Sequence, residues 1–181
     1  EVAGKIVELG DNVQGFQVGD RVTAAHHVPC NTCHYCLSGH HTLCPTLKST
    51  NFDPGGFVEY VRLMPIHVDR GLFKLSDTIS YEEATFAEPL GCVLRGQRVA
   101  RLQPWQSVLV VGSGLAGLLH IKLARATTTG TILAVDINKY RLDAALDFGA
   151  DVSLDARDNL PTKVREANGG FLAQLVIVCT G

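Results

Sequence analysis

The sequence has no run of basic residues and no excess of positive charge. Its 16 lysines and arginines are outnumbered by 18 aspartates and glutamates, which gives a formal net charge of −2. A nucleic-acid surface needs clustered positive charge to displace counterions, so the composition weighs against nucleic acid as a partner. We also find no apolar run that could span a bilayer and no signal peptide with a charged start. We therefore expect no membrane partner and a cytoplasmic location.

Charged residues are scarce at 19%, whereas hydrophobic residues make up 46% of the 181 residues. Such a composition favours a globular core and excludes a disordered chain. The length fits one large domain or two small ones.

Most of the cysteine is concentrated in one short segment. Four of the six cysteines lie within fifteen residues: Cys30, Cys33, Cys36 and Cys44. Two residues between thiols is the spacing at which a turn directs two sulfurs at one ion, and four thiolates complete a tetrahedron around Zn²⁺. We therefore predict a structural zinc site, and a reducing compartment in the absence of a secretion signal. Cys92 and Cys179 stand alone in apolar segments, and we interpret them as buried small hydrophobic residues.

Two alternatives to zinc remain at this cluster. The Cys-x2-Cys-x2-Cys run with a later Cys-Pro is similar to the ferredoxin iron–sulfur run, but seven residues precede the fourth cysteine here and three precede it there. A redox dithiol is the second alternative, although it needs only two thiols. His34, His40 and His41 could substitute as zinc ligands. Because four sulfurs suffice, we expect these histidines to be solvated.

A glycine-rich loop follows a short β-branched run and precedes a helical pattern. A G-x-G-x-x-G string alone is weak evidence, but strand, loop, helix and second strand are the required context. The first glycine permits the tight turn, the second lets a pyrophosphate approach, and the third lets the helix pack on the strand. Free N–H groups at the helix start would face the phosphates. The predicted dinucleotide loop comprises Gly112, Ser113, Gly114, Leu115, Ala116 and Gly117. The alternative is the same α/β unit without a ligand.

Asp136 ends the second strand of this unit, nineteen residues after the last loop glycine. A carboxylate there accepts hydrogen bonds from the adenosine ribose and repels a 2′-phosphate, so NAD is favoured over NADP. Lys139 and Arg141 keep NADP open, because an arginine at this place can hold a phosphate. Thr180 follows the last predicted strand, where it would border the cofactor crevice.

The second half of the chain alternates strands and helices, which predicts a partial doubly wound parallel sheet of the Rossmann type. Strands are expected over residues 108–111, 131–135, 151–154 and 175–179. Helices are expected over about 115–127, 139–147 and 161–168. The last strand is continuously apolar, as in a strand covered on both faces.

The first 75 residues predict a small β domain that carries the cysteine lobe, about residues 28–48. Strand patterns lie over residues 4–10, after the turn at 19–22, and over 55–61. We place the domain boundary between residues 1–88 and 89–181.

A capping box, Ser80-Tyr-Glu-Glu83, opens a helix near that boundary. Pro89 is expected to begin a second helix, about 89–99, as its first residue. Glu88 lies just before it in an apolar stretch and needs a partner. That partner is either Arg95 or Arg98, or a metal ion at the domain junction.

A four-cysteine loop inside a β domain, followed by a dinucleotide fold, resembles the zinc-dependent medium-chain dehydrogenase/reductase family. Gly19-Asp20-Arg21-Val22 and Gly56-Phe57-Val58-Glu59-Tyr60 are similar to the signatures of its GroES-like β domain. Ala87-Glu88-Pro89-Leu90-Gly91 resembles the sorbitol and threonine dehydrogenase branch, in which a glutamate here lies at the catalytic zinc. The spacing of Asp136 and Arg141 is similar to the way that branch holds adenosine.

The resemblance implies a zinc-dependent, NAD(P)-linked oxidoreductase that acts on the CH–OH group of a small alcohol or polyol, in a homo-oligomer. A plain alcohol dehydrogenase, a non-catalytic NAD-binding zinc protein and a nucleic-acid-binding zinc protein are the alternatives. Glu1 resembles the glutamate of the family's Gly-His-Glu triplet, whose histidine, with a cysteine ligand, would precede residue 1. We therefore expect an internal fragment that lacks the catalytic zinc, is inactive alone, and is marginally stable or self-associating through an apolar sheet edge.

Overall fold

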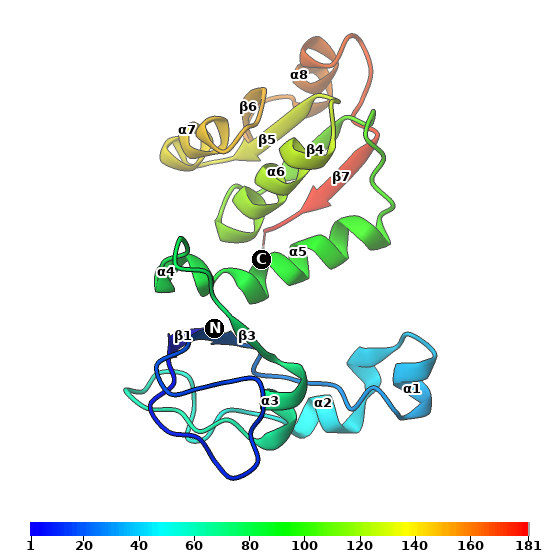
Figure 1. Ribbon diagram of the computed structural model, residues 1–181. Helices are drawn as coiled ribbons and strands as arrows, with labels where there is room; N and C mark the ends of the chain where they lie inside the picture. The colour runs from blue at the N-terminus through cyan, green and yellow to red at the C-terminus, as the bar shows by residue number, and fades with distance from the viewer. Residues whose placement is uncertain (181) are drawn as a thin grey trace. The chain divides into compact units, whose positions relative to one another are not determined.

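The chain alternates short strands with helices in two units of different texture (Figure 1). The computed structural model describes residues 1–180 and separates them into Glu1–Glu88 and the residues from Pro89 onward. Among residues 1–180 no helix has the length and apolar character that a bilayer crossing requires.

The first unit contains a three-stranded antiparallel sheet in the order β1-β2-β3. Its strands are β1 (Val2–Lys5), β2 (Arg21–Ala24) and β3 (Leu72–Lys74). Val2 lies opposite Ala24, and Val22 lies opposite Lys74. β2 is therefore the central strand, and it follows the predicted turn, in which Gly19 has φ of 98°.

Two predicted strands of this unit are wrong in extent or existence. The first was expected over residues 4–10, but β1 ends at Lys5 because β2 begins opposite it at Arg21. Residues 55–61 form no strand, and only an isolated bridge joins Asp53 to Arg62. Their apolar side chains have no core to cover, since Phe57 is fully exposed. Alternation of apolar residues indicates one apolar face, but a strand also needs a partner.

Two helix signals in the sequence, the capping box and Pro89, lie at the starts of α4 (Tyr81–Ala84) and α5 (Ala87–Val99). The capping box is confirmed at the start of α4: Glu83 N donates to Ser80 Oγ at 3.1 Å, and Ser80 N donates to Glu83 Oε2 at 2.8 Å. α5 begins two residues earlier than expected. Pro89 thus lies in its first turn, where a missing N–H costs no helical hydrogen bond.

The short helices of the first unit are those of the cysteine segment and one that precedes β3. They are α1 (His34–Leu37), the 3₁₀ turn η1 (His41–Leu43), α2 (Pro45–Ser49) and α3 (Pro65–Arg70).

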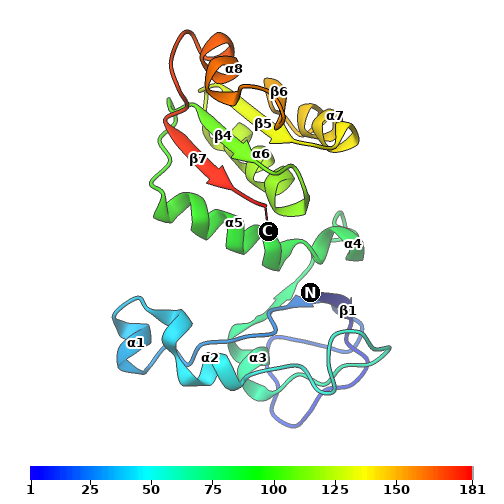
Figure 2. The same cartoon turned by 180° about the vertical axis from the view of Figure 1, so that it is seen from behind.

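The second unit contains a four-stranded parallel sheet in the order β6-β5-β4-β7 (Figure 2). The chain runs β4 (Val108–Val111), α6 (Leu115–Thr127), β5 (Ile132–Asp136), α7 (Lys139–Asp147), β6 (Val152–Asp155), α8 (Leu160–Ala167) and β7 (Leu175–Val178). This confirms the parallel architecture. The direction of strand addition reverses between β4 and β7, which is where doubly wound sheets bind their ligands.

Alternate strand residues pack against helices on opposite faces of this sheet. Ile121 of α6 and Ala145 of α7 share one apolar cluster with Val110 of β4. Val164 of α8 packs with Val135 of β5 in the other. β5 is buried along its whole length, as expected for a central strand.

The last strand is not covered on both faces, contrary to the sequence prediction. Val176 and Val178 of β7 are 52% and 67% exposed. In the described sheet β7 pairs with β4 on one side and lies at the edge. The face that carries Val176 and Val178 is apolar and solvent-exposed, and such a surface on an edge strand favours association.

Candidate functional site

The four cysteines of the first unit meet at one point. Their sulfur atoms all lie within 4.8 Å of one another. The Sγ–Sγ distances are 4.0 Å for Cys30 and Cys36, 3.6 Å for Cys33 and Cys36, and 3.6 Å for Cys30 and Cys44. A tetrahedral ion with Zn–S bonds of about 2.3 Å holds its sulfurs about 3.8 Å apart. The donor set and its spacing therefore fit a structural zinc ion.

Short local elements position these sulfurs. Cys33 is the N-cap of α1, Cys36 lies within α1, and Cys44 is the N-cap of α2. The N–H groups of Thr32 and Cys33 approach Cys30 Sγ at 3.5 and 3.3 Å, and Cys30 N lies 3.4 Å from Cys44 Sγ. N–H groups aimed at sulfur favour the thiolate, which is the form that binds metal.

The thiols are electrostatically unequal. Hydrogen bonds from Thr32, together with the Cys33 N–H, lower the pKa of Cys30 to about 5. Burial, followed by the interaction with Cys33, raises the pKa of Cys36 to about 12. Four adjacent thiolates repel one another, so complete deprotonation requires a cation among them. Metal binding and the ordering of this lobe are therefore coupled.

The remaining histidines and cysteines that the sequence singled out have mixed outcomes. His34 and His40 are exposed, and His41 is half-buried, and within residues 1–180 the only metal-ligating group that the structure brings together consists of the four cysteines. Cys92 is exposed, so its interpretation as a buried residue is wrong. Cys179 is half-buried, and burial raises the pKa of its thiol.

The glycine loop of the second unit lies between β4 and α6, at the reversal point of the sheet. Gly112 has φ of 95°, and a Cβ there would lie 2.8 Å from Thr180 Cγ2. A Cβ on Gly117 would lie 1.9 Å from the Gly112 carbonyl oxygen. A Cβ on Gly114 would meet no atom within 4 Å. Two glycines are thus required by the protein itself, and the middle one leaves open space.

That open space lies at a helix N-terminus. Gly114 is the N-cap of α6 and provides no side-chain acceptor for the first N–H groups. Leu115 and Ala116, the first residues of the helix, are exposed, whereas Ser113 is fully buried. Orphan N–H groups at the positive end of a helix bind phosphate. The loop therefore fits a pyrophosphate.

Asp136 lies at the carboxyl end of β5 and is 6% exposed. Its Oδ2 accepts from Ser113 N at 2.8 Å, and its Oδ1 accepts from Asn138 N at 2.9 Å. Burial opposes ionisation of this carboxyl, but the N–H groups of Asn138, Ser113 and Ile137, with Arg141, outweigh it and lower its pKa. The carboxylate therefore stays charged and connects the second strand to the glycine loop.

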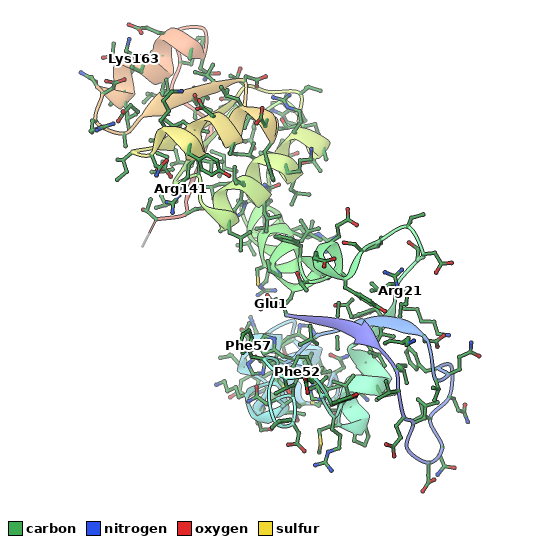
Figure 3. All side chains as sticks on the ribbon, turned by 90° about the vertical axis from the view of Figure 1, so that its left-hand side faces the viewer. Glu1, Arg21, Phe52, Phe57, Arg141 and Lys163 are labelled. Carbon is green, nitrogen blue, oxygen red and sulfur yellow. The ribbon has the colours of Figure 1, made fainter. Side chains whose placement is uncertain are left out.

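Arg141 lies beside Asp136, and Thr180 adjoins Gly112 of the glycine loop. Arg141 Nη1 is 3.8 Å from Asp136 Oδ2, and its side chain is 54% exposed (Figure 3). Thr180 is exposed and adjoins Gly112.

The two candidate catalytic carboxylates lie in the first unit. Glu1 is exposed at the start of β1 (Figure 3), and Glu88 is half-buried in the first turn of α5. Burial and His27 lower the pKa of His26, whereas Glu88 and Glu1 raise it. The net shift of the His26 pKa is downward, because burial and His27 outweigh the two carboxylates.

Sequence reasoning missed His26. The β1–β2 register places it just beyond the residue opposite Glu1. Its carbonyl is held by His67 Nε2 at 3.0 Å. The sequence signal available was the pair His26-His27, which begins two residues after β2 ends. This is the end of the sheet at which Glu1 precedes β1.

Comparison with known proteins agrees with this geometry. Residues 1–75 match the family described as the alcohol dehydrogenase GroES-like domain. The chain is 34% identical to a sorbitol dehydrogenase of Bacillus subtilis over 87% of its length and 44% of that protein. It is 33% identical to an L-threonine 3-dehydrogenase of Symbiobacterium thermophilum over its whole length and 51% of that protein.

The chain belongs to the zinc-dependent medium-chain dehydrogenase family. The structure of the alcohol dehydrogenase TADH from Thermus sp. ATN1 resembles it with a TM-score of 0.83 at 29% identity, over 99% of this chain and 53% of that one. The chain spans about half the length of the curated relatives it matches. In this family the first unit is a GroES-like β domain, and the cysteine cluster fits its zinc-binding lobe.

Proposed function

We propose that the whole protein is a zinc-dependent, NAD-linked dehydrogenase that oxidises the CH–OH group of a polyol such as sorbitol, or of a related small alcohol. We further propose that it is cytoplasmic and homo-oligomeric. The observation that carries the cofactor assignment is the ionised, buried Asp136 joined to the glycine loop through Ser113 N–H at 2.8 Å.

The named relatives support the substrate class, since they include a sorbitol and a threonine dehydrogenase. The metal-type spacing of Cys30, Cys33, Cys36 and Cys44 supports a reducing compartment.

Each group of this chain has a separate task in the proposed reaction. The N–H groups after Gly114 hold the pyrophosphate, and Asp136 accepts from the ribose hydroxyls. Glu88 and Glu1 are proposed as the carboxylates that the chain contributes at the catalytic metal. The four-cysteine lobe is proposed to be structural, because four sulfurs leave no position for a substrate. When bound, a catalytic zinc supplies Lewis acidity to the substrate hydroxyl, and NAD accepts the hydride.

A plain alcohol dehydrogenase is the second candidate, favoured by the structural similarity to TADH. A non-catalytic NAD-binding zinc protein is the alternative outside the enzyme class. The 181 residues alone are proposed to be inactive, because the only metal-ligating group found among residues 1–180 is the cysteine cluster.

The deciding experiment follows NADH formation by the protein in its full natural length, with sorbitol, xylitol, threonine and ethanol supplied separately. Turnover of a polyol in preference to ethanol supports the first candidate. Preference for ethanol supports the second. Binding of NAD with no turnover of any substrate class contradicts both.

A further inference from the structure

An ion pair between Asp155 and Arg157 lies beside Asp136, the carboxylate proposed to bind the ribose. β5 and β6 are in register so that Asp136 lies opposite Asp155, and both strands end there. Arg157 Nε donates to Asp155 Oδ1 at 2.8 Å, and its Nη2 donates to Asp155 Oδ2 at 2.5 Å. The same Nη2 is 3.4 Å from the carbonyl oxygen of Ile137. A guanidinium thus lies next to the first residue after Asp136.

The two side chains of this pair bind each other, but the Arg157 side chain remains exposed to solvent. Asp155 Oδ1 also accepts from the backbone N–H of Arg157 at 2.9 Å, so one carboxylate fixes both the loop and the guanidinium. The Arg157 side chain lowers the pKa of Asp155 to about 2, and Asp155 raises the pKa of Arg157. The pair therefore stays ionised. The Arg157 side chain is nevertheless 73% exposed.

The charges around the ribose position are balanced. Asp136 is matched by Arg141 at 3.8 Å, and Asp155 is matched by Arg157. A bidentate carboxylate occupies one edge of a guanidinium in the same way that a phosphate does. While Asp155 holds that edge, the bidentate Nε–Nη2 edge of the guanidinium is not available to an incoming anion.

We propose that Asp155 is a cofactor-specificity residue, which withholds the Arg157 guanidinium from the ribose site and so disfavours the 2′-phosphate of NADP. The proposal rests on the NAD-linked function proposed above. It assigns selectivity for NAD over NADP to Asp155, a second carboxylate that does not itself accept a hydrogen bond from the ribose.

The test is the substitution Asp155→Asn in the protein in its full natural length. Asparagine keeps the Oδ1 acceptor for the Arg157 N–H and removes the charge that holds the guanidinium. The dissociation constants of NAD and NADP are measured by calorimetry. We expect the NADP affinity to rise about tenfold, the gain of one charge-assisted contact, and the NAD affinity to stay unchanged.

Two further variants identify the cause of a gain. Glu166→Gln makes the same change in net charge and breaks an exposed pair with Lys163 on α8, whose side chain lies well away from Arg141 (Figure 3). It should leave both affinities unchanged. The double variant D155N/R157Q should lose the gain, because the released guanidinium is gone.

The failures of the two proposals are distinguishable. If the unmodified protein binds neither cofactor, the proposed NAD-linked function is wrong. If it binds NAD and D155N shows no gain for NADP, only the role of Asp155 is wrong. A gain that survives in D155N/R157Q, or that E166Q reproduces, also overturns it, since charge alone would then be the cause.

Discussion

Alanine substitutions at three glycines separate the two tasks that the sequence motif combines. A Cβ on Gly117 would lie 1.9 Å from the Gly112 carbonyl oxygen, and a Cβ on Gly130 would lie 2.1 Å from the Gln106 carbonyl oxygen. Real Cβ contacts essentially never fall below 3.0 Å, so the backbone must shift in both variants. A Cβ on Gly114 meets nothing within 4 Å, and its φ of −74° suits alanine.

The expected magnitudes follow from these contacts. Overpacking costs about 1–3 kcal/mol, and a clash with backbone falls at the upper end. In a unit of this size that lowers the melting temperature by roughly 10 °C or more. Alanine at an N-cap costs about 0.5–1 kcal/mol relative to glycine, so Gly114→Ala should melt within a few degrees of the unmodified protein.

The stabilisation gained on adding NAD should rank the variants Gly114→Ala and Gly130→Ala in the opposite order. NAD at one hundred times its dissociation constant stabilises a protein by about 2.7 kcal/mol. Gly130→Ala lies outside the loop and should keep this stabilisation despite its low melting temperature. Gly114→Ala should lose it, because the methyl group occupies the space assigned to the pyrophosphate.

The assay is thermal unfolding of each variant, in the protein of full natural length, with and without NAD. A Gly117→Ala variant as stable as the unmodified protein would refute the close approach of α6 to the loop. A Gly114→Ala variant that keeps the full NAD effect would show that the phosphates bind elsewhere.

Three more perturbations test the remaining claims. Cys36→Ser should reduce the zinc content of the purified 181-residue chain from one ion to well below one by metal analysis, whereas Cys92→Ser should leave it at one; equal losses would contradict the four-sulfur site. Asp136→Asn should weaken NAD binding about tenfold, because a charged acceptor of ribose hydroxyls becomes neutral. Since the folded-state pKa of Asp136 is lowered, its contribution to stability is fully present above its ordinary value of 3.8 and is lost as the pH falls through the folded value. Urea unfolding as a function of pH should therefore show less acid sensitivity in that variant, and an unchanged pH profile would contradict the assignment. Val176→Lys with Val178→Lys should shift the 181-residue chain toward monomer in size-exclusion chromatography with light scattering, and a chain that is already a stable monomer would refute association through β7.

The second half of the fold was predictable because its patterns are local. The helices expected over residues 115–127 and 139–147 are α6 and α7 with the same bounds. In a parallel α/β unit each strand is followed by its own helix, so hydrophobic periodicity and sequence order together determine the neighbours. The apolar sheet edge was expected, but the exposure of Val176 and Val178 was not predictable, because a continuous apolar run carries no information about which side is covered.

The first half was less predictable because its strands pair over long separations. β3 went unrecognised: it is three residues long and contacts β2 about fifty residues away. Its sequence, Leu72–Lys74, has no alternation to detect. Conversely, the apolar residues around Phe57 alternate without any strand opposite them. Antiparallel pairing depends on a partner that the local sequence does not specify.

The same distinction separates the site residues that spacing predicted from those it missed. The metal site requires cysteines at fixed intervals, and the phosphate site requires glycines where a Cβ would clash. Both requirements are therefore visible in the sequence as residue patterns. His26 and Asp155 acquire their surroundings from strand register: His26 lies just beyond the residue opposite Glu1, and Asp155 lies opposite Asp136. Neither position requires a particular residue type for folding, and the only local mark at His26 is the adjacent His27. Residues that adjust selectivity are therefore expected at such register-determined positions, and they have to be found from the structure.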